Sequence, residues 1–152
     1  MSLKQKIEAA FVDTLRNTSE LDTAVVKFYT GQENQRTPRG LPCVTVDASG
    51  SREEPLNTGN FKYRVLVGVW GSADQALEDD PLPEELHAEN VRACQRALNI
   101  PQRDLAALLS TGAGDFHCFG VVRQGQVPHE PDRRAFVDFF SYEVTVCEVT
   151  FV

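Results

Sequence analysis

Residues 61–71 read FKYRVLVGVWG, and their alternation predicts a β-strand with two different faces. One face carries apolar and aromatic side chains: Phe61, Tyr63, Val65, Val67 and Val69. The other face carries Lys62, Arg64, Leu66, Gly68 and Trp70. Successive side chains of a strand point to opposite sides, so the first set predicts the buried face of a sheet. The second set faces either a helix or another subunit, because Trp and Arg are common at the centres of interfaces.

Similar patterns predict further strands on both sides of this segment. Residues 41–48 alternate, and residues 135–149 place aromatic and aliphatic side chains on a core face that Asp138 interrupts. Residues 25–29 and 116–122 are short and rich in β-branched and aromatic side chains, which favours strands. A helix capped by Ser19 is the alternative for the first of these. Polar and turn-forming residues predict exposed loops at 32–40, 49–60 and 123–134.

Helical spacing of apolar residues predicts an amphipathic helix over residues 2–16 and a second helix that Asp80 caps and that runs to residue 98. A short third helix follows Pro101 and stops at Thr111. Strands in hairpins with helices between them predict an α+β fold. We expect one domain over residues 1–152, with a mostly antiparallel mixed sheet flanked by two to three helices. No signal-peptide pattern and no apolar run of about 20 residues is present, so we expect no membrane association.

The negative charge of the chain is concentrated in one stretch. The sequence has 22 acidic and 15 basic residues, for a net charge of −7. Residues 74–89 contain seven of the acids and no Lys or Arg, namely Asp74, Glu78, Asp79, Asp80, Glu84, Glu85 and Glu89. Removing this stretch leaves 15 acids and 15 bases, so the rest is neutral. A protein that wraps nucleic acid would need a dense basic stripe instead.

Patterns typical of catalytic or metal sites do not occur. Four cysteines (Cys43, Cys94, Cys118, Cys147) are spread without a CxxC pair, and we expect free, buried thiols. His117 and Cys118 are neighbours on a predicted strand, so they point to opposite faces and do not share a metal. His87 and Cys94 are about two helical turns apart, too far for one ion. We therefore expect no catalytic residue, no cofactor and no metal.

Surface residues instead suggest contacts with other subunits. The two long loops between the N-terminal helix and the 61–71 strand carry charges of both signs: Arg36, Arg39, Arg52, Glu53 and Glu54. Together with the polar face of the 61–71 strand they form the predicted subunit interface, which includes Lys62, Arg64, Leu66 and Trp70. The alternative is that these loops are exposed and contact nothing.

The order of elements resembles the tail-terminator, tail-completion and neck (head–tail joining) proteins of long-tailed bacteriophages and prophages. An N-terminal helix precedes the strand LPCVTV (41–46), a long loop and the strand NFKYRVLVGVWG (60–71). A helix ELHAENVRACQRAL (85–98) and an aromatic strand RAFVDFFSYEVTV (134–146) follow. The resemblance covers nearly the whole chain, in element order and strand character.

The resemblance implies a virion structural protein and no enzyme. Such minor tail proteins commonly form a homohexameric ring that caps the tail tube, joins it to the head connector, and lets DNA pass without specific binding. The chain would reside in the host cytoplasm before assembly and in the virion afterwards. The acidic stretch then lines the lumen or faces solvent, and both placements stay open. The alternatives are a small cytoplasmic enzyme or ligand-binding domain with a pocket between helix and sheet, and a dimeric interaction module.

Overall fold

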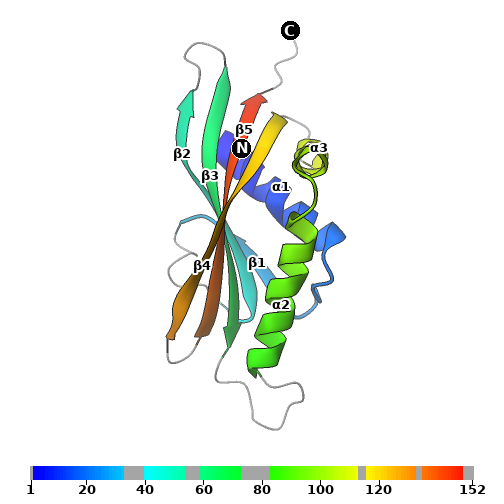
Figure 1. Ribbon diagram of the computed structural model, residues 1–152, viewed down its shortest axis with the longest axis vertical. Helices are drawn as coiled ribbons and strands as arrows, with labels where there is room; N and C mark the ends of the chain where they lie inside the picture. Colours follow the sequence, from blue (N-terminus) through cyan, green and yellow to red (C-terminus); the bar gives the residue numbers. More distant parts are fainter. Residues whose placement is uncertain are drawn as a thin grey trace.

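The computed structural model describes residues 2–32, 40–53, 59–72, 83–112, 116–132 and 135–148. These residues form three helices and five strands in an α+β arrangement, as predicted (Figure 1). In chain order the elements are α1 (Leu3–Thr18), β1 (Lys27–Thr30), β2 (Cys43–Glu53), β3 (Asn60–Ser72), α2 (Pro83–Leu98), α3 (Gln102–Gly112), β4 (Phe116–Asp132) and β5 (Ala135–Glu148). No helix in the described ranges is long and apolar enough to cross a membrane.

The strands form one mixed, mostly antiparallel sheet in the order β1-β2-β3-β5-β4. The short strand β1 runs parallel to β2, and the other neighbours are antiparallel. The predicted central segment is β3, which pairs with β2 on one side and along its whole length with β5 on the other. All three helices pack on the same face of this sheet (Figure 1).

The main core lies between that face and the helices. Val65 and Val67 of β3 are fully buried, as are Val44 and Val46 of β2. Strand β5 contributes the aromatic residues Phe140 and Tyr142, and Tyr142 packs against Phe11 of α1 with ring centroids 5.8 Å apart. The alternation read from residues 61–71 therefore assigns the buried face correctly. The amphipathic pattern of residues 2–16 is also confirmed: α1 begins after Ser2, whose hydroxyl oxygen accepts the Gln5 N–H at 3.2 Å.

Strand β2 is longer than predicted, and the predicted loop at 49–60 is wrong for its first part. Residues 49–53 continue β2, although its pairing with β3 shifts between Ser49 and Arg52. Gly50 lies in this shift with φ of 69°, a conformation that glycine adopts without steric cost. The turn-like residues at 49–51 therefore form an irregularity within a strand.

The predicted loop at 123–134 is wrong in the same way. Residues 123–132 continue β4 alongside β5, with shifts of register between Arg123 and Gly125 and between His129 and Asp132. Each shift breaks the alternation by which strands are recognised. At the opposite edge of the sheet, β1 spans Lys27–Thr30, so the alternative helix capped by Ser19 does not form there. The predicted cap Asp80 lies outside the described residues.

A buried ionic group closes the part of the β2 edge that β1 does not reach. Glu8 of α1 is 3% exposed, and its Oε2 accepts the Ala48 N–H at 3.1 Å. Lys4 donates to Glu8 at 2.7 Å and to Asp47 at 2.9 Å. Burial alone would lower the pKa of Lys4, but the hydrogen bonds and charges of Glu8 and Asp47 outweigh it and raise that pKa. The lysine therefore stays charged, which a buried carboxylate beside it requires.

All four cysteines are free thiols. Cys43, Cys94 and Cys118 are buried as predicted, whereas Cys147 is partly exposed. Burial raises the pKa of Cys43 and of Cys94 to about 12. Burial also raises the pKa of Cys118 to about 11, against the lowering effect of its hydrogen bond to the Gly120 carbonyl. These thiols stay neutral in the folded chain at pH values where the unfolded chain ionises them.

These raised pKa values predict a loss of stability at alkaline pH. A group whose pKa is raised by folding stabilises the folded state below the unfolded pKa, and this contribution falls as pH rises. Between about pH 7.5 and pH 10, each buried thiol should cost about 1.5 to 2 kcal/mol of unfolding free energy. Urea unfolding under reducing conditions at both pH values measures this loss.

The comparison of two variants assigns the effect to a single thiol. Cys94→Ala should be less stable at neutral pH because of its cavity, but should lose about 1.5 to 2 kcal/mol less between the two pH values than the parent. Cys147→Ala, at the partly exposed position, is the control. An unchanged pH dependence in Cys94→Ala would contradict the assignment.

Candidate functional site

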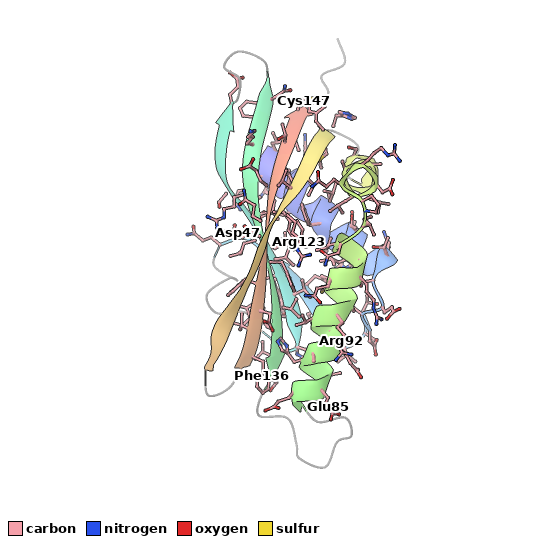
Figure 2. The ribbon with its side chains drawn as sticks, in the orientation of Figure 1. Asp47, Glu85, Arg92, Arg123, Phe136 and Cys147 are labelled. Atoms are coloured by element: carbon pink, nitrogen blue, oxygen red, sulfur yellow. The ribbon has the colours of Figure 1, made fainter. Side chains whose placement is uncertain are left out.

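The predicted site residues Lys62, Arg64, Leu66 and Trp70 meet on the sheet face opposite the helices. No helix in the described parts of the chain covers it, and Figure 2 shows Asp47 on this side, away from α2. The register aligns its side chains in rows across the strands. One half is apolar and aromatic, and the other half is charged. We call this surface the open face.

The apolar half of the open face is a compact group that we call the aromatic cluster: Tyr29, Cys43, Trp70, Val137 and Phe139. Trp70 lies on the open face as predicted, but it is only 8% exposed and does not project from it. Its indole N–H donates to Thr45 Oγ1 at 2.9 Å. The Phe139 ring meets the indole edge to face, with centroids 5.7 Å apart. The cluster is therefore a small buried core of its own, in which only Tyr29 and Phe139 are partly exposed.

Gly68 makes the close packing of this cluster possible. A Cβ atom at Gly68 would lie 2.6 Å from Thr45 Oγ1 and 2.8 Å from both Trp70 Nε1 and Phe139 Cε1. Three side chains thus converge over a position that has none. The indole rests across its own strand, and its N–H finds a partner within the sheet. A buried indole N–H normally has such a partner.

The charged half of the open face contains Lys62 and Arg64, again as predicted. Lys62 Nζ lies 3.8 Å from Glu143 Oε1, and Arg64 Nε donates to Ser141 Oγ at 3.2 Å. Arg64 is exposed and Leu66, the next residue of this face, is partly buried. Contacts of this kind at the surface contribute little to stability.

The predicted loop residues are brought to this surface only in part. Arg36, Arg39 and Glu54 lie outside the described residues. Arg52 is placed opposite Lys62 at the end of the β2–β3 pair. Glu53 accepts the Gly59 N–H at 3.2 Å, so its carboxylate ties the two ends of the β2–β3 connection together.

The described part of the acidic stretch lies on α2. Glu84, Glu85 and Glu89 are exposed, and Glu84 and Glu85 occupy the first turn, where they complement the helix dipole. With Arg92 they line a shallow depression of about 450 Å³. Figure 2 shows Glu85 and Arg92 on α2. The other predicted acids, Asp74, Glu78, Asp79 and Asp80, lie outside the described residues. The depression is on the helical side of the molecule, away from the open face.

A partly buried histidine–carboxylate pair that the sequence did not reveal joins α2 to the sheet. His87 is 8% exposed, and its Nε2 lies 2.8 Å from Asp138 Oδ2 of β5. The imidazole stacks on Phe136 with centroids 5.7 Å apart, at the end of the sheet beside the first turns of α2 (Figure 2). A Cβ at Gly71 would come 2.8 Å from His87 Nδ1, so the glycine admits the ring. This explains why a carboxylate interrupts the core face of β5.

The chemistry available at this pair is limited. Nδ1 of His87 is buried and has no hydrogen-bond partner within the described structure. The ring atom faces Gly71 instead of a cavity. No group of three or more metal-ligating side chains forms among the described residues. His117 and Cys118, adjacent in sequence, point to opposite sides as predicted, with His117 exposed and Cys118 buried.

The aromatic cluster predicts a strong dependence on Gly68. Gly68→Ala should lower the unfolding free energy by about 1 to 3 kcal/mol, because Thr45, Trp70 and Phe139 must all move. Gly120→Ala is the matched control: it is a strand glycine with nothing within 4 Å of the added Cβ. It should change stability by less than about 0.5 kcal/mol. Equal effects in thermal or urea unfolding would contradict the packing described for Trp70.

The His87–Asp138 pair predicts a graded response at position 138. Asp138→Ala removes the partner of a buried imidazole nitrogen and should cost about 1 to 3 kcal/mol. Asp138→Asn keeps an oxygen acceptor at the same place and should cost less. Urea unfolding of the two variants tests this order. A loss in Asp138→Asn as large as in Asp138→Ala would show that the acceptor is not what matters.

No protein-family model matches the chain, and no curated protein sequence matches it.

Proposed function

We propose that the chain is a virion structural protein of a long-tailed bacteriophage or prophage. In this proposal it is a tail-terminator or tail-completion protein at the head–tail junction. Copies assemble into a ring, which we expect to be a hexamer. The ring caps the tail tube and binds the head connector. The support from the sequence is the resemblance in element order over nearly the whole chain. The protein acts in assembly without catalysis.

The observation that carries the proposal is the open face. Three helices cover one side of a five-stranded sheet, and no described helix covers the other. That side carries the charged side chains Lys62 and Arg64 next to the partly exposed rings Tyr29 and Phe139, and aromatic and arginine side chains are enriched at protein interfaces. A ring needs two different patches on each subunit, because head-to-tail contacts close on themselves. The open face supplies one, and the segments 32–40 and 49–60 supply the other in this proposal.

A ring at the end of the tube also has consequences for tail length, for the passage of DNA and for the exposed acids of α2. Once a ring occupies the last layer of the tube, no further tube subunit adds, so tail length is fixed by steric blocking. DNA passes through the ring without specific binding. The acidic side chains Glu84, Glu85 and Glu89 are all exposed on α2. If they line the channel, they repel the phosphates and keep the DNA from adhering.

An enzyme or ligand-binding domain is the alternative. An enclosed apolar pocket with converging polar groups would favour it. The groove between α3 and β4, of about 600 Å³, lies open at the surface, and His117 at its wall is exposed. No specific observation among the described residues favours this alternative.

Charge reversal on the open face tests the proposal. Native mass spectrometry of the purified chain should show a hexamer. Arg64→Glu should reduce the hexamer at least about tenfold relative to monomer, because like charges across a contact are unfavourable. Arg92→Glu makes the same charge change at an exposed residue of α2, on the helical side, and should leave the hexamer intact.

The stability of both variants is measured by thermal unfolding, so that a folding defect is recognised. A parent chain that stays monomeric at high concentration contradicts the ring. A hexamer that survives Arg64→Glu unchanged contradicts the role of the open face but leaves the ring in place.

A further inference from the structure

The hydrogen bonds that β1 makes to β2 stop one step short of Ala48. Strand β1 runs parallel to β2, and just after its end the Val46 carbonyl accepts the Gly31 N–H at 3.1 Å. In a parallel ladder, a residue that donates to one carbonyl also accepts from the N–H two residues further along the partner strand. The next bond of this ladder would therefore join the Ala48 N–H to the Gly31 carbonyl.

A side chain of α1 takes the place of that carbonyl. Strand β1 ends at Thr30, and Gly31 has φ of 95°, a left-handed conformation in which the chain leaves the strand. The Ala48 N–H donates to Glu8 Oε2 at 3.1 Å. Glu8 thus occupies the hydrogen-bonding position that a further residue of β1, or of any other strand at this edge, would use.

Two charged partners hold Glu8 in this position. Lys4 lies one helical turn before Glu8 on the same side of α1, and its Nζ is 2.7 Å from Glu8 Oε2 and 2.9 Å from Asp47 Oδ1. The side chain of Glu8 is almost fully buried, whereas that of Lys4 is 40% exposed. Helix α1 is therefore fastened to two consecutive residues of β2, Asp47 and Ala48.

Stability alone does not explain a buried carboxylate at this place. A single N–H at the edge of a sheet can bond to water when it is exposed. Burying Glu8 instead takes a charge out of water and requires the charge of Lys4 to offset it. Buried ion pairs often add no net stability, and one role for them is to exclude alternative arrangements. The alternative here is pairing with another molecule, for which an edge strand with free N–H and C=O groups is a template.

We propose that the contact of Glu8 with Lys4, Asp47 and Ala48 is autoinhibitory and prevents the outer edge of β2 from pairing with a strand of a second copy. We call this contact the edge block. The carboxylate fills the position of an incoming carbonyl, and α1 fills the space beside it. The edge block concerns pairing of backbones, so it holds whether or not the copies form the proposed ring.

Sedimentation velocity of Glu8→Ala tests the edge block. The substitution removes the acceptor of the Ala48 N–H and one of the two carboxylates that hold Lys4. The variant should form species larger than those of the parent chain, in an amount that rises with concentration. At equal concentration this amount should exceed that of the parent by about fivefold or more.

Two control variants leave the edge block intact. Glu20→Ala also removes a carboxylate, but one whose ion pair with Arg96 of α2 is exposed, and it should sediment like the parent. Cys94→Ala is destabilised in the core, so it reports whether lower stability alone causes association. Association of either control to the extent of Glu8→Ala would overturn the proposal.

Hydrogen exchange at the Ala48 amide distinguishes edge pairing from other kinds of association. In the parent this amide should exchange slowly, because a buried side chain accepts it. In Glu8→Ala it should exchange fast at low concentration and slowly where the larger species form, since a partner strand then accepts it. Larger species without this renewed protection would overturn the proposal, because the copies would then associate through another surface.

A folded Glu8→Ala that sediments like the parent at every concentration also overturns the proposal. If thermal unfolding shows that Glu8→Ala does not fold, Lys4→Ala is measured in its place. Lys4 is partly exposed, and its loss leaves the buried carboxylate without a cation, which should loosen α1 from β2. Lys4→Ala that associates no more than the parent then overturns the edge block.

Discussion

The alternation of side chains along β3 decides how the rest of the molecule is built. Its valines are fully buried on one face of the sheet, and all three helices pack on that face. Nothing in the described chain remains to cover the other side. On the open face the apolar side chains pack against one another: Trp70 lies over Gly68, and its indole N–H donates to Thr45 Oγ1. A single strand thus separates a packed layer from a surface suited to contact another molecule.

The two edges of the sheet differ in how far the rest of the chain covers them. On the β2 side, a short strand and a buried carboxylate satisfy the outer backbone groups. On the β4 side, α3 stands beside the strand through Ser110 but leaves a groove and the exposed Phe119. The two edges of a subunit are therefore different surfaces, so that copies joined edge to edge would all point the same way. A directional subunit suits head-to-tail assembly, which is what the proposed ring requires.

The sequence predicted the α+β class, the buried face of β3 and the amphipathic helices, because periodicity reports directly on burial. It failed at residues 49–53 and 123–132, where bulges interrupt the alternation and polar residues face solvent on a strand. The His87–Asp138 pair was out of reach, because it depends on a helix and a strand that are 51 residues apart. The position of Trp70 was predicted, but its burial depends on Gly68 and Phe139, which only the register brings together.

The central claim is that this chain assembles into a closed ring through surfaces that its own helices leave uncovered. Electron microscopy of the purified protein, with class averages of the particles, tests it most directly. The account predicts six-fold rings in which the open face lies at the contact between neighbouring subunits. Monomers at high concentration, or closed dimers, would contradict it.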